Sequence, residues 1–131
     1  LRAVHPGFML HFVPWSREAV AAELAKAHLV LLPQDASGPW GRAKSHNRLV
    51  ETLRAGRFAI ASPIPSYLEM KDYAWVGSSL GDGVLWALSH RNAVLAKVCA
   101  GQLYVEQRFA PHVIGERWAQ ALKLDAEASV Q

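Results

Sequence analysis

Two short apolar runs without polar interruption stand out in the chain. Leu29–Leu32 and Phe58–Ala61 are continuous rather than alternating, as is typical of strands buried on both faces of a parallel sheet. Residues 8–13 and 74–76 are also rich in strand-forming side chains, and residues 1–4 resemble the remnant of a further strand. The pattern therefore predicts several short strands separated by longer, more polar stretches.

Helical patterns lie between these runs. A helix is expected over residues 17–27 behind a Ser16 cap, and a second one starts in the polar residues 44–48 and stops at Gly56. The remaining predicted helices are a single turn at 66–72, a helix at 83–89 capped by Asp82, a long helix from Asn92 to before Pro111, and a last helix with the apolar stripe Ile114, Trp118 and Leu122.

Strands and helices alternate along most of the chain, and helices accumulate at its end. Such alternation argues for right-handed βαβ units, in which a helix crosses between parallel strands. We therefore predict an α/β fold, a Rossmann-like three-layer α/β/α sandwich with a parallel sheet and C-terminal helices. The 131 residues amount to one domain, and the start at Leu1 without methionine leads us to expect a truncated piece of a longer polypeptide.

Composition narrows the classes of function. Charged residues make up 19% of the chain and the formal net charge is +3, so a nucleic-acid surface is not required but anionic small ligands are compatible. Cys99 is the one cysteine and is expected in a helix core, which excludes an intrachain disulfide and a cysteine-rich metal site. No apolar run reaches the roughly 18 residues of a membrane span and no signal peptide is visible, so a soluble, cytoplasmic protein is expected.

The candidate chemistry begins at the start of the second helix. Lys44 and Arg48 are four residues apart there, and Ser45 and Asn47 lie between them. Cationic groups and exposed amides therefore converge as a phosphate site requires. The alternative is a solvated helix start. The position just after Leu29–Leu32 favours a site, because ligands of open α/β sheets bind beyond the carboxyl ends of the strands.

Two carboxylates lie in the same region. Glu51 follows one helical turn later, where it could accept both hydroxyls of a ribose, and the alternative is an ion pair with Arg48 or Arg54. Ser66 and Glu69 have the spacing of a capping box, which gives that glutamate a structural role. The predicted binding residues are Lys44, Ser45, Asn47, Arg48, Glu51, Ser66 and Glu69, and no catalytic residue is assigned.

Several fingerprints are absent from the sequence. Neither GxGxxG nor GxxxxGK[ST] occurs, so the nicotinamide-type and P-loop patterns are missing. The six histidines are scattered, so no metal is predicted, and only His46 lies in the ligand region. Of the five tryptophans, Trp40 in a Gly-Pro loop is a candidate to pack over a ligand. The other four are expected in the core: Trp15, Trp75, Trp86 and Trp118.

The order of residues from Glu51 to Gly77 resembles that of a known family. A glutamate (Glu51), small and apolar residues, a glycine (Gly56), the strand Phe58–Ala61, and a turn leading to Glu69 and Gly77 are similar to the donor-binding half of GT-B-type glycosyltransferases. The upstream strand, helix and strand and the closing helices extend the resemblance over most of the chain.

The resemblance implies a domain that binds a nucleotide-sugar, with Glu51 at the ribose and with Lys44 and the amides near Ser45 at the diphosphate. The donor is a substrate, and no cofactor or metal is implied. Families with a paired-glutamate motif have another glutamate eight positions earlier, where this chain has Ala43, which implies a different sugar clamp. The N-terminal, acceptor-binding half of such enzymes is not in this chain, so the piece is expected to bind weakly and to turn over nothing alone.

Two other classes of function stay open. A small flavodoxin-like signalling or phosphate-sensing domain has a similar size and alternation, but no acidic cluster follows the first strand to hold a metal. A noncatalytic interaction module fits the pI near 9.3 and the aromatic loop at Trp40. The basic surface is also compatible with peripheral association with anionic lipid, although no amphipathic basic helix supports it.

Overall fold

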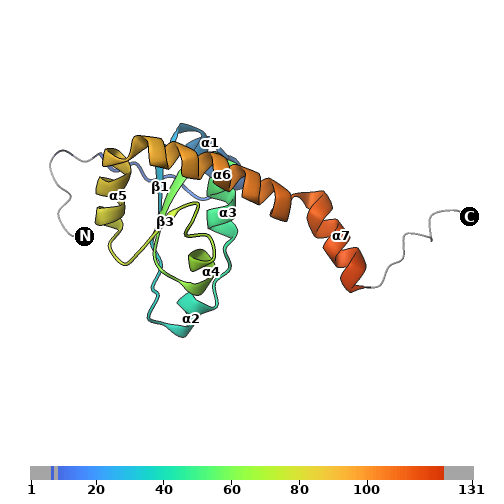
Figure 1. Cartoon of the computed structure of the whole chain (residues 1–131). Coiled ribbons are helices and arrows are strands. Elements are labelled where there is room, and N and C mark those ends of the chain that lie inside the picture. The colour runs from blue at the N-terminus through green and yellow to red at the C-terminus, as the bar shows by residue number, and fades with distance from the viewer. Residues whose placement is uncertain (1–6, 8, 123–131) are drawn as a thin grey trace, which may run out of the picture.

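The computed structural model describes residue 7 and residues 9–122 of the chain (Figure 1). In chain order the elements of this part are α1 (Arg17–Lys26), β1 (Leu29–Leu32), α2 (Pro39–Arg42), α3 (Asn47–Arg54), β2 (Phe58–Ala61), α4 (Pro65–Leu68), β3 (Trp75–Val76), α5 (Leu80–Ser89), α6 (Arg91–Phe109) and α7 (Pro111–Ala121). The strand predicted at residues 1–4 lies outside the described residues.

The three strands form one parallel sheet in the order β1-β2-β3. The central strand is β2, since Phe58 pairs with Leu29 of β1 while Ile60 pairs with Trp75 of β3. Helices connect successive strands, as parallel pairing requires. The predicted α/β fold with a parallel sheet is therefore confirmed.

Burial differs between the two longer strands. All four residues of β2 are buried, as predicted for a strand covered on both faces. In β1, Leu31 keeps 49% of its surface exposed, so the same prediction is wrong for that strand. The physical reason is that, in the described part of the chain, β1 has a neighbouring strand on one side only, and the helix α1 beside it buries no residue.

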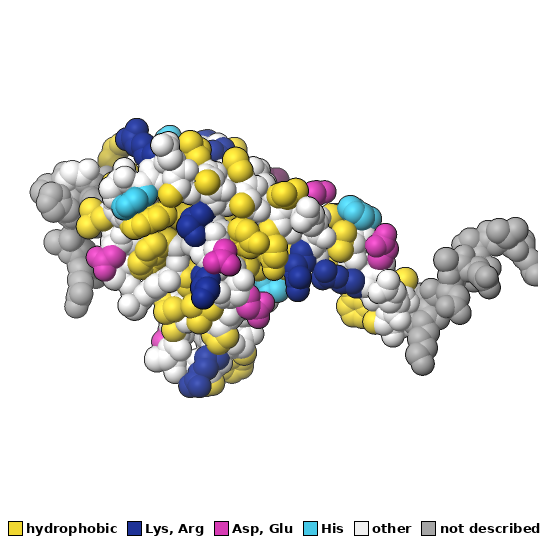
Figure 2. Space-filling view, viewed as in Figure 1, with side chains coloured by type: hydrophobic (Ala, Val, Ile, Leu, Met, Phe, Trp, Pro, Cys, Tyr) yellow, Lys and Arg dark blue, Asp and Glu magenta, His cyan; other side chains and the backbone are white. Residues whose placement is uncertain are grey.

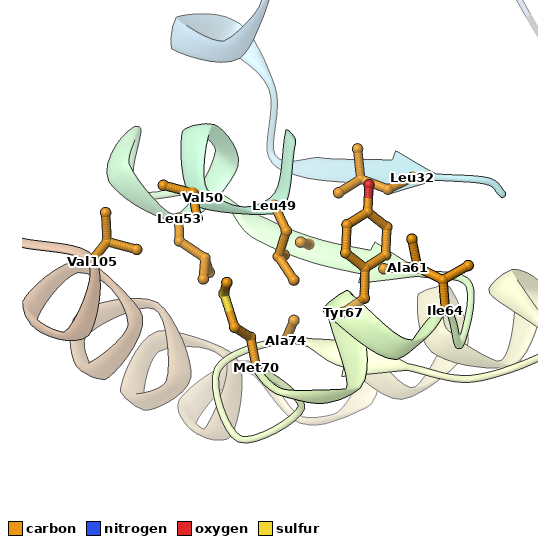
Figure 3. Packing of buried hydrophobic residues seen from close by; sticks show 11 residues of the cluster. Leu32, Leu49, Val50, Leu53, Ala61, Ile64, Tyr67, Met70, Ala74 and Val105 are labelled. Carbon is orange, nitrogen blue, oxygen red and sulfur yellow. The ribbon is translucent and has the colours of Figure 1, made fainter. Parts of the chain in front are cut away.

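Side chains of β2 alternate between two apolar clusters. Ala59 and Ala61 belong to a cluster formed with α3, α4 and α6, whereas Phe58 and Ile60 belong to a cluster formed with α5 and α6. Because successive side chains of a strand point to opposite faces, apolar side chains cover the sheet on both sides. Figure 3 shows the first cluster, whose buried members include Leu49, Leu53, Tyr67, Met70 and Val105.

Most helix ends follow local sequence signals. Ser16 caps α1 as predicted, because its Oγ accepts a hydrogen bond from the N–H of Ala19 at 3.0 Å. After α3, Gly56 has a φ of 68°, a left-handed conformation that glycine adopts without steric cost. The cap of α5 is Ser79 rather than the predicted Asp82, since Ser79 Oγ accepts from the Asp82 amide at 3.2 Å. That helix therefore begins three residues earlier than expected, at Leu80.

The capping box predicted at Ser66 and Glu69 is wrong. The short helix α4 begins at Pro65 with Ile64 as its N-cap. Proline favours the first helical position, because it lacks an N–H and its φ is already helical. Ser66 consequently lies inside the helix, and Glu69 is at its C-cap.

The last two helices pack very differently. α6 packs against the core and buries Gly101 and Val105. α7 extends away from the body of the molecule and buries no residue (Figure 1). The stripe predicted for this last helix is therefore not a buried face, and Trp118 is 63% exposed.

Three more expectations about the core are corrected. Trp15 is 71% exposed and Cys99 is exposed, so neither is a core residue, whereas Trp75 and Trp86 pack against the second cluster as predicted.

Residues 9–15 have no regular secondary structure, so the strand predicted at 8–13 is wrong over its described part. No strand of the sheet pairs with this segment, and an extended segment needs such a neighbour to satisfy its backbone. Within the described residues, no helix combines the length and apolar character needed to cross a membrane.

Candidate functional site

Helix α3 has one buried face and one exposed face, as its periodicity requires. It buries Leu49, Val50, Thr52 and Leu53 against the sheet and α6, and it leaves Asn47, Arg48 and Glu51 exposed. Positions three and four apart share one face of a helix. Three of the predicted site residues therefore form one stripe on the outer side of α3.

This stripe is one wall of a groove of about 860 Å³ between α3 and α1. On the other wall, Trp15 and Arg17 lie at the N-terminal end of α1, and the apolar residues Val20, Ala21 and Leu24 follow them. The structure thus brings Asn47, Arg48 and Glu51 together with a helix that the sequence analysis left out of the site.

Arg57 fixes one end of this groove. Its guanidinium donates hydrogen bonds to the carbonyl oxygens of Leu24 and Ala25, at 2.8 and 2.7 Å. These carbonyls belong to the last turn of α1, whose C-terminal end carries partial negative charge. The C-terminal end of α1 is therefore tied to the start of β2.

The groove is positively charged. Four arginines and one carboxylate line it. Two of these arginines already make hydrogen bonds within the fold, since Arg57 binds α1 and Arg54 donates to the carbonyl of Phe109 at 3.1 Å. Arg17 and Arg48 make no hydrogen bond or ion pair with the described residues. Two guanidinium groups therefore remain for an anionic ligand.

Glu51 is the one carboxylate among the α3 residues that line the groove, and its side chain is exposed. Among the residues described, the ion pair that forms joins Lys26 and Glu23, at 3.1 Å. The alternative in which Glu51 pairs with Arg48 or Arg54 is therefore wrong. A free carboxylate can accept hydrogen bonds from hydroxyl groups of a ligand.

Lys44 and Ser45 lie apart from this groove. The Lys44 ammonium donates to the side-chain carbonyl of Gln34, and the backbone N–H of Gln34 donates to Ser62 Oγ at 2.9 Å. Gln34 and Ser62 follow β1 and β2, so Lys44 stands at the carboxyl ends of the two strands. Ser45 is exposed. The site predicted at one helix start is thus divided between the strand ends and the groove.

Tyr67 lies beneath the strand ends and is 1% exposed. Burial raises the pKa of its hydroxyl, while the positive charge of Arg48 and a hydrogen bond to Gln34 oppose that rise. Arg48 therefore acts on both places, since it lines the groove and its charge reaches the phenol below the strand ends.

Ser66 and Glu69 lie outside the groove. The Ser66 hydroxyl is buried and has no hydrogen-bond partner among the described residues, and Glu69 is exposed at the end of α4. Neither residue lines the groove. The geometry does not join them to Asn47, Arg48 and Glu51.

Two other residues from the sequence analysis also lie outside the groove. Trp40 is 84% exposed on α2 and does not line the groove, so its contact with a ligand stays a prediction. His46 is half-buried as the N-cap of α3 and packs against the ring of Phe109, with 5.0 Å between ring centroids. In the described part of the chain, no three histidine, cysteine or acidic side chains gather as a metal site would need.

Sequence reasoning missed Trp15 and Arg17. Both flank the Ser16 cap, and a residue just before or after a cap is often exposed at a helix start. That signal alone cannot show that α1 faces α3, because the pairing of the two helices is a tertiary contact.

Comparison with protein-family models, with curated proteins and with solved structures gives no match for this chain.

Proposed function

We propose that this chain is the nucleotide-sugar-binding domain of a glycosyltransferase of the GT-B type. In this proposal the parent enzyme transfers a sugar from an activated nucleotide to a glycan or lipid-linked acceptor. Glu51 accepts the ribose hydroxyls of the donor, and the nearby cations neutralise its diphosphate. The acceptor is bound by the other half of the enzyme, and this domain alone has no turnover.

The observation that carries the proposal is the free carboxylate of Glu51 in an otherwise cationic groove. A ligand that carries both hydroxyls and phosphates matches this mixture of one acceptor and two unpaired guanidinium groups, Arg17 and Arg48. The order Glu51, Gly56 and β2, which carries the resemblance to the family, supports the same class. Lys44 and the amides near Ser45 remain proposed contacts of the diphosphate or sugar at the strand ends.

The proposed architecture is a Rossmann-like three-layer sandwich formed by a single domain. Two apolar clusters on opposite faces of β2 support it, since a parallel sheet in such a fold is covered by helices on both sides.

A thermal-shift screen with UDP, GDP, dTDP, CMP and their sugar conjugates tests the proposal. Ligand at about 100 times its Kd stabilises the native state by about 2.7 kcal/mol, which raises Tm by several degrees. We expect one base to be preferred, and we expect Glu51→Gln to remove the shift. Glu106→Gln, at an exposed position of α6, is the matched control and should keep it. Binding that is unchanged in both Glu51→Gln and Lys44→Ala would contradict the proposal.

A second candidate is a noncatalytic interaction module, favoured by the 84% exposure of Trp40. Figure 2 shows lysine and arginine side chains spread among hydrophobic ones on the face in view rather than gathered in one patch. Such a surface suits an acidic protein partner. An interaction that weakens with salt, depends on Trp40 and is insensitive to every nucleotide would favour this candidate.

A further inference from the structure

We infer that the N-terminal end of α1 forms the second half of the nucleotide site, with Trp15 as the platform for the base and Arg17 as a phosphate contact. This inference rests on the proposed function and deepens it. It assigns residues from a segment that the sequence resemblance does not include among the ligand contacts.

The exposure of Trp15 is the first observation. An indole that is 71% exposed leaves a large apolar ring in water, although the same residue lines the groove opposite α3. An exposed aromatic ring can stack with any base, because every base has an aromatic face. Trp15 therefore provides an aromatic face for stacking. The α3 wall has none, since its groove residues are polar or small.

The second observation is the division of the arginines. The two that line the C-terminal part of the groove, Arg54 and Arg57, are bound to backbone carbonyls, whereas Arg17 and Arg48 keep their guanidinium groups free of described partners. Arg17 is the first residue of α1, and Arg48 is the second residue of α3. The free cations thus belong to the N-terminal ends of the two walls, where helix dipoles also favour anions.

These groups match the three parts of a nucleoside diphosphate. An aromatic face suits the base, a free carboxylate suits the ribose hydroxyls, and two guanidinium groups suit the phosphates. A free sugar would use only the carboxylate, and an acidic peptide would use only the guanidinium groups. A nucleoside diphosphate is therefore the ligand class that uses Trp15, Glu51 and Arg17 together.

Parallel titrations with UDP, GDP, dTDP and inorganic pyrophosphate separate these roles. Trp15→Ala should weaken nucleotide binding about tenfold, following the stacking energy, and leave pyrophosphate binding unchanged. Trp15→Phe keeps a ring and should restore most of the nucleotide affinity. Arg17→Gln should weaken nucleotide and pyrophosphate alike. The matched controls are Trp118→Ala and Arg117→Gln, two exposed residues of α7, and both should bind as the unmodified chain does.

The results distinguish failure of the inference from failure of the proposed function. If nucleotides bind and Glu51→Gln abolishes binding, but Trp15→Ala and Arg17→Gln bind normally, the inference is overturned and the proposed function stands. If no nucleotide binds to the unmodified chain, both are overturned.

Discussion

The buried hydroxyl of Tyr67 makes the stability of the fold depend on pH. Because folding raises the pKa of its hydroxyl above the value near 10 of the unfolded chain, the folded state holds this proton more tightly. The stabilising contribution is complete below pH 10 and is lost as the pH rises through the folded pKa.

The prediction at this residue is an alkaline change in relative stability. The difference in unfolding free energy between the unmodified chain and Tyr67→Phe should be constant below pH 10 and should then shift in favour of the variant. Urea unfolding between pH 8 and 11 measures it. Tyr73→Phe, at a half-buried position, serves as the control for the titration of other groups. A difference that does not change with pH would disprove the assignment.

Single residues also show what the sequence could predict of the site. The grouping of Asn47, Arg48 and Glu51 could be predicted, because helical spacing alone puts them on one face. The capping box at Ser66 and Glu69 was predicted wrongly, because Pro65 takes the first helical position and the N-cap is Ile64, two residues before Ser66. Trp15 could not be placed in the groove from the sequence, since a tryptophan is usually buried and only the packing of α1 leaves this one exposed.

At the scale of elements, Gly56 decides how α3 ends. Its φ of 68° is costly for other residues, and an added Cβ would lie 2.8 Å from the side-chain amide of Gln102. Gly56→Ala should therefore lower the unfolding free energy by about 1–2 kcal/mol. Gly115→Ala is the control, because Gly115 lies within α7 with open space around it, and it should be neutral or slightly stabilising. Equal effects in chemical denaturation would contradict this role of Gly56.

Helix α1 depends on a contact from outside itself. It buries no residue, and the two hydrogen bonds from Arg57 join it to β2. Arg57→Gln should speed amide hydrogen exchange in α1 about tenfold, since a hydrogen bond to a charged group contributes about 1.5–3 kcal/mol. The amides of β2 should keep their protection, and Arg91→Gln, at an exposed position, should change neither element. Unchanged exchange in α1 would show that another contact holds it.

Among the elements, β2, β1, α1 and α3 were predicted well, because continuous apolar runs, a serine cap and a C-terminal glycine are local signals. The strand at 8–13 was predicted from the same kind of apolar run and is absent from its described part. Strand propensity is not sufficient by itself, since a strand also needs a paired neighbour. The edge position of β1 was equally hidden, because sheet order is set by the whole chain.

At the scale of the whole molecule, stability depends on the two clusters that cover the sheet. Leu53 of α3 is fully buried within the first cluster, so Leu53→Ala should cost about 2–5 kcal/mol of unfolding free energy. Leu103→Ala removes the same atoms from a side chain that is 59% exposed and should change stability by less than about 0.5 kcal/mol. Similar losses in thermal or urea unfolding would mean that the cluster around Leu53 is not the stabilising core.

In the proposed function, the groove between α1 and α3 binds a nucleotide through Glu51. The most direct measurement is a titration with UDP, GDP or dTDP followed by the backbone amide and indole NMR signals of the chain. We expect shifts concentrated at Asn47, Arg48, Glu51 and the Trp15 indole, and their loss in Glu51→Gln. Shifts confined to α2 or α7, or none with any nucleotide, would contradict it.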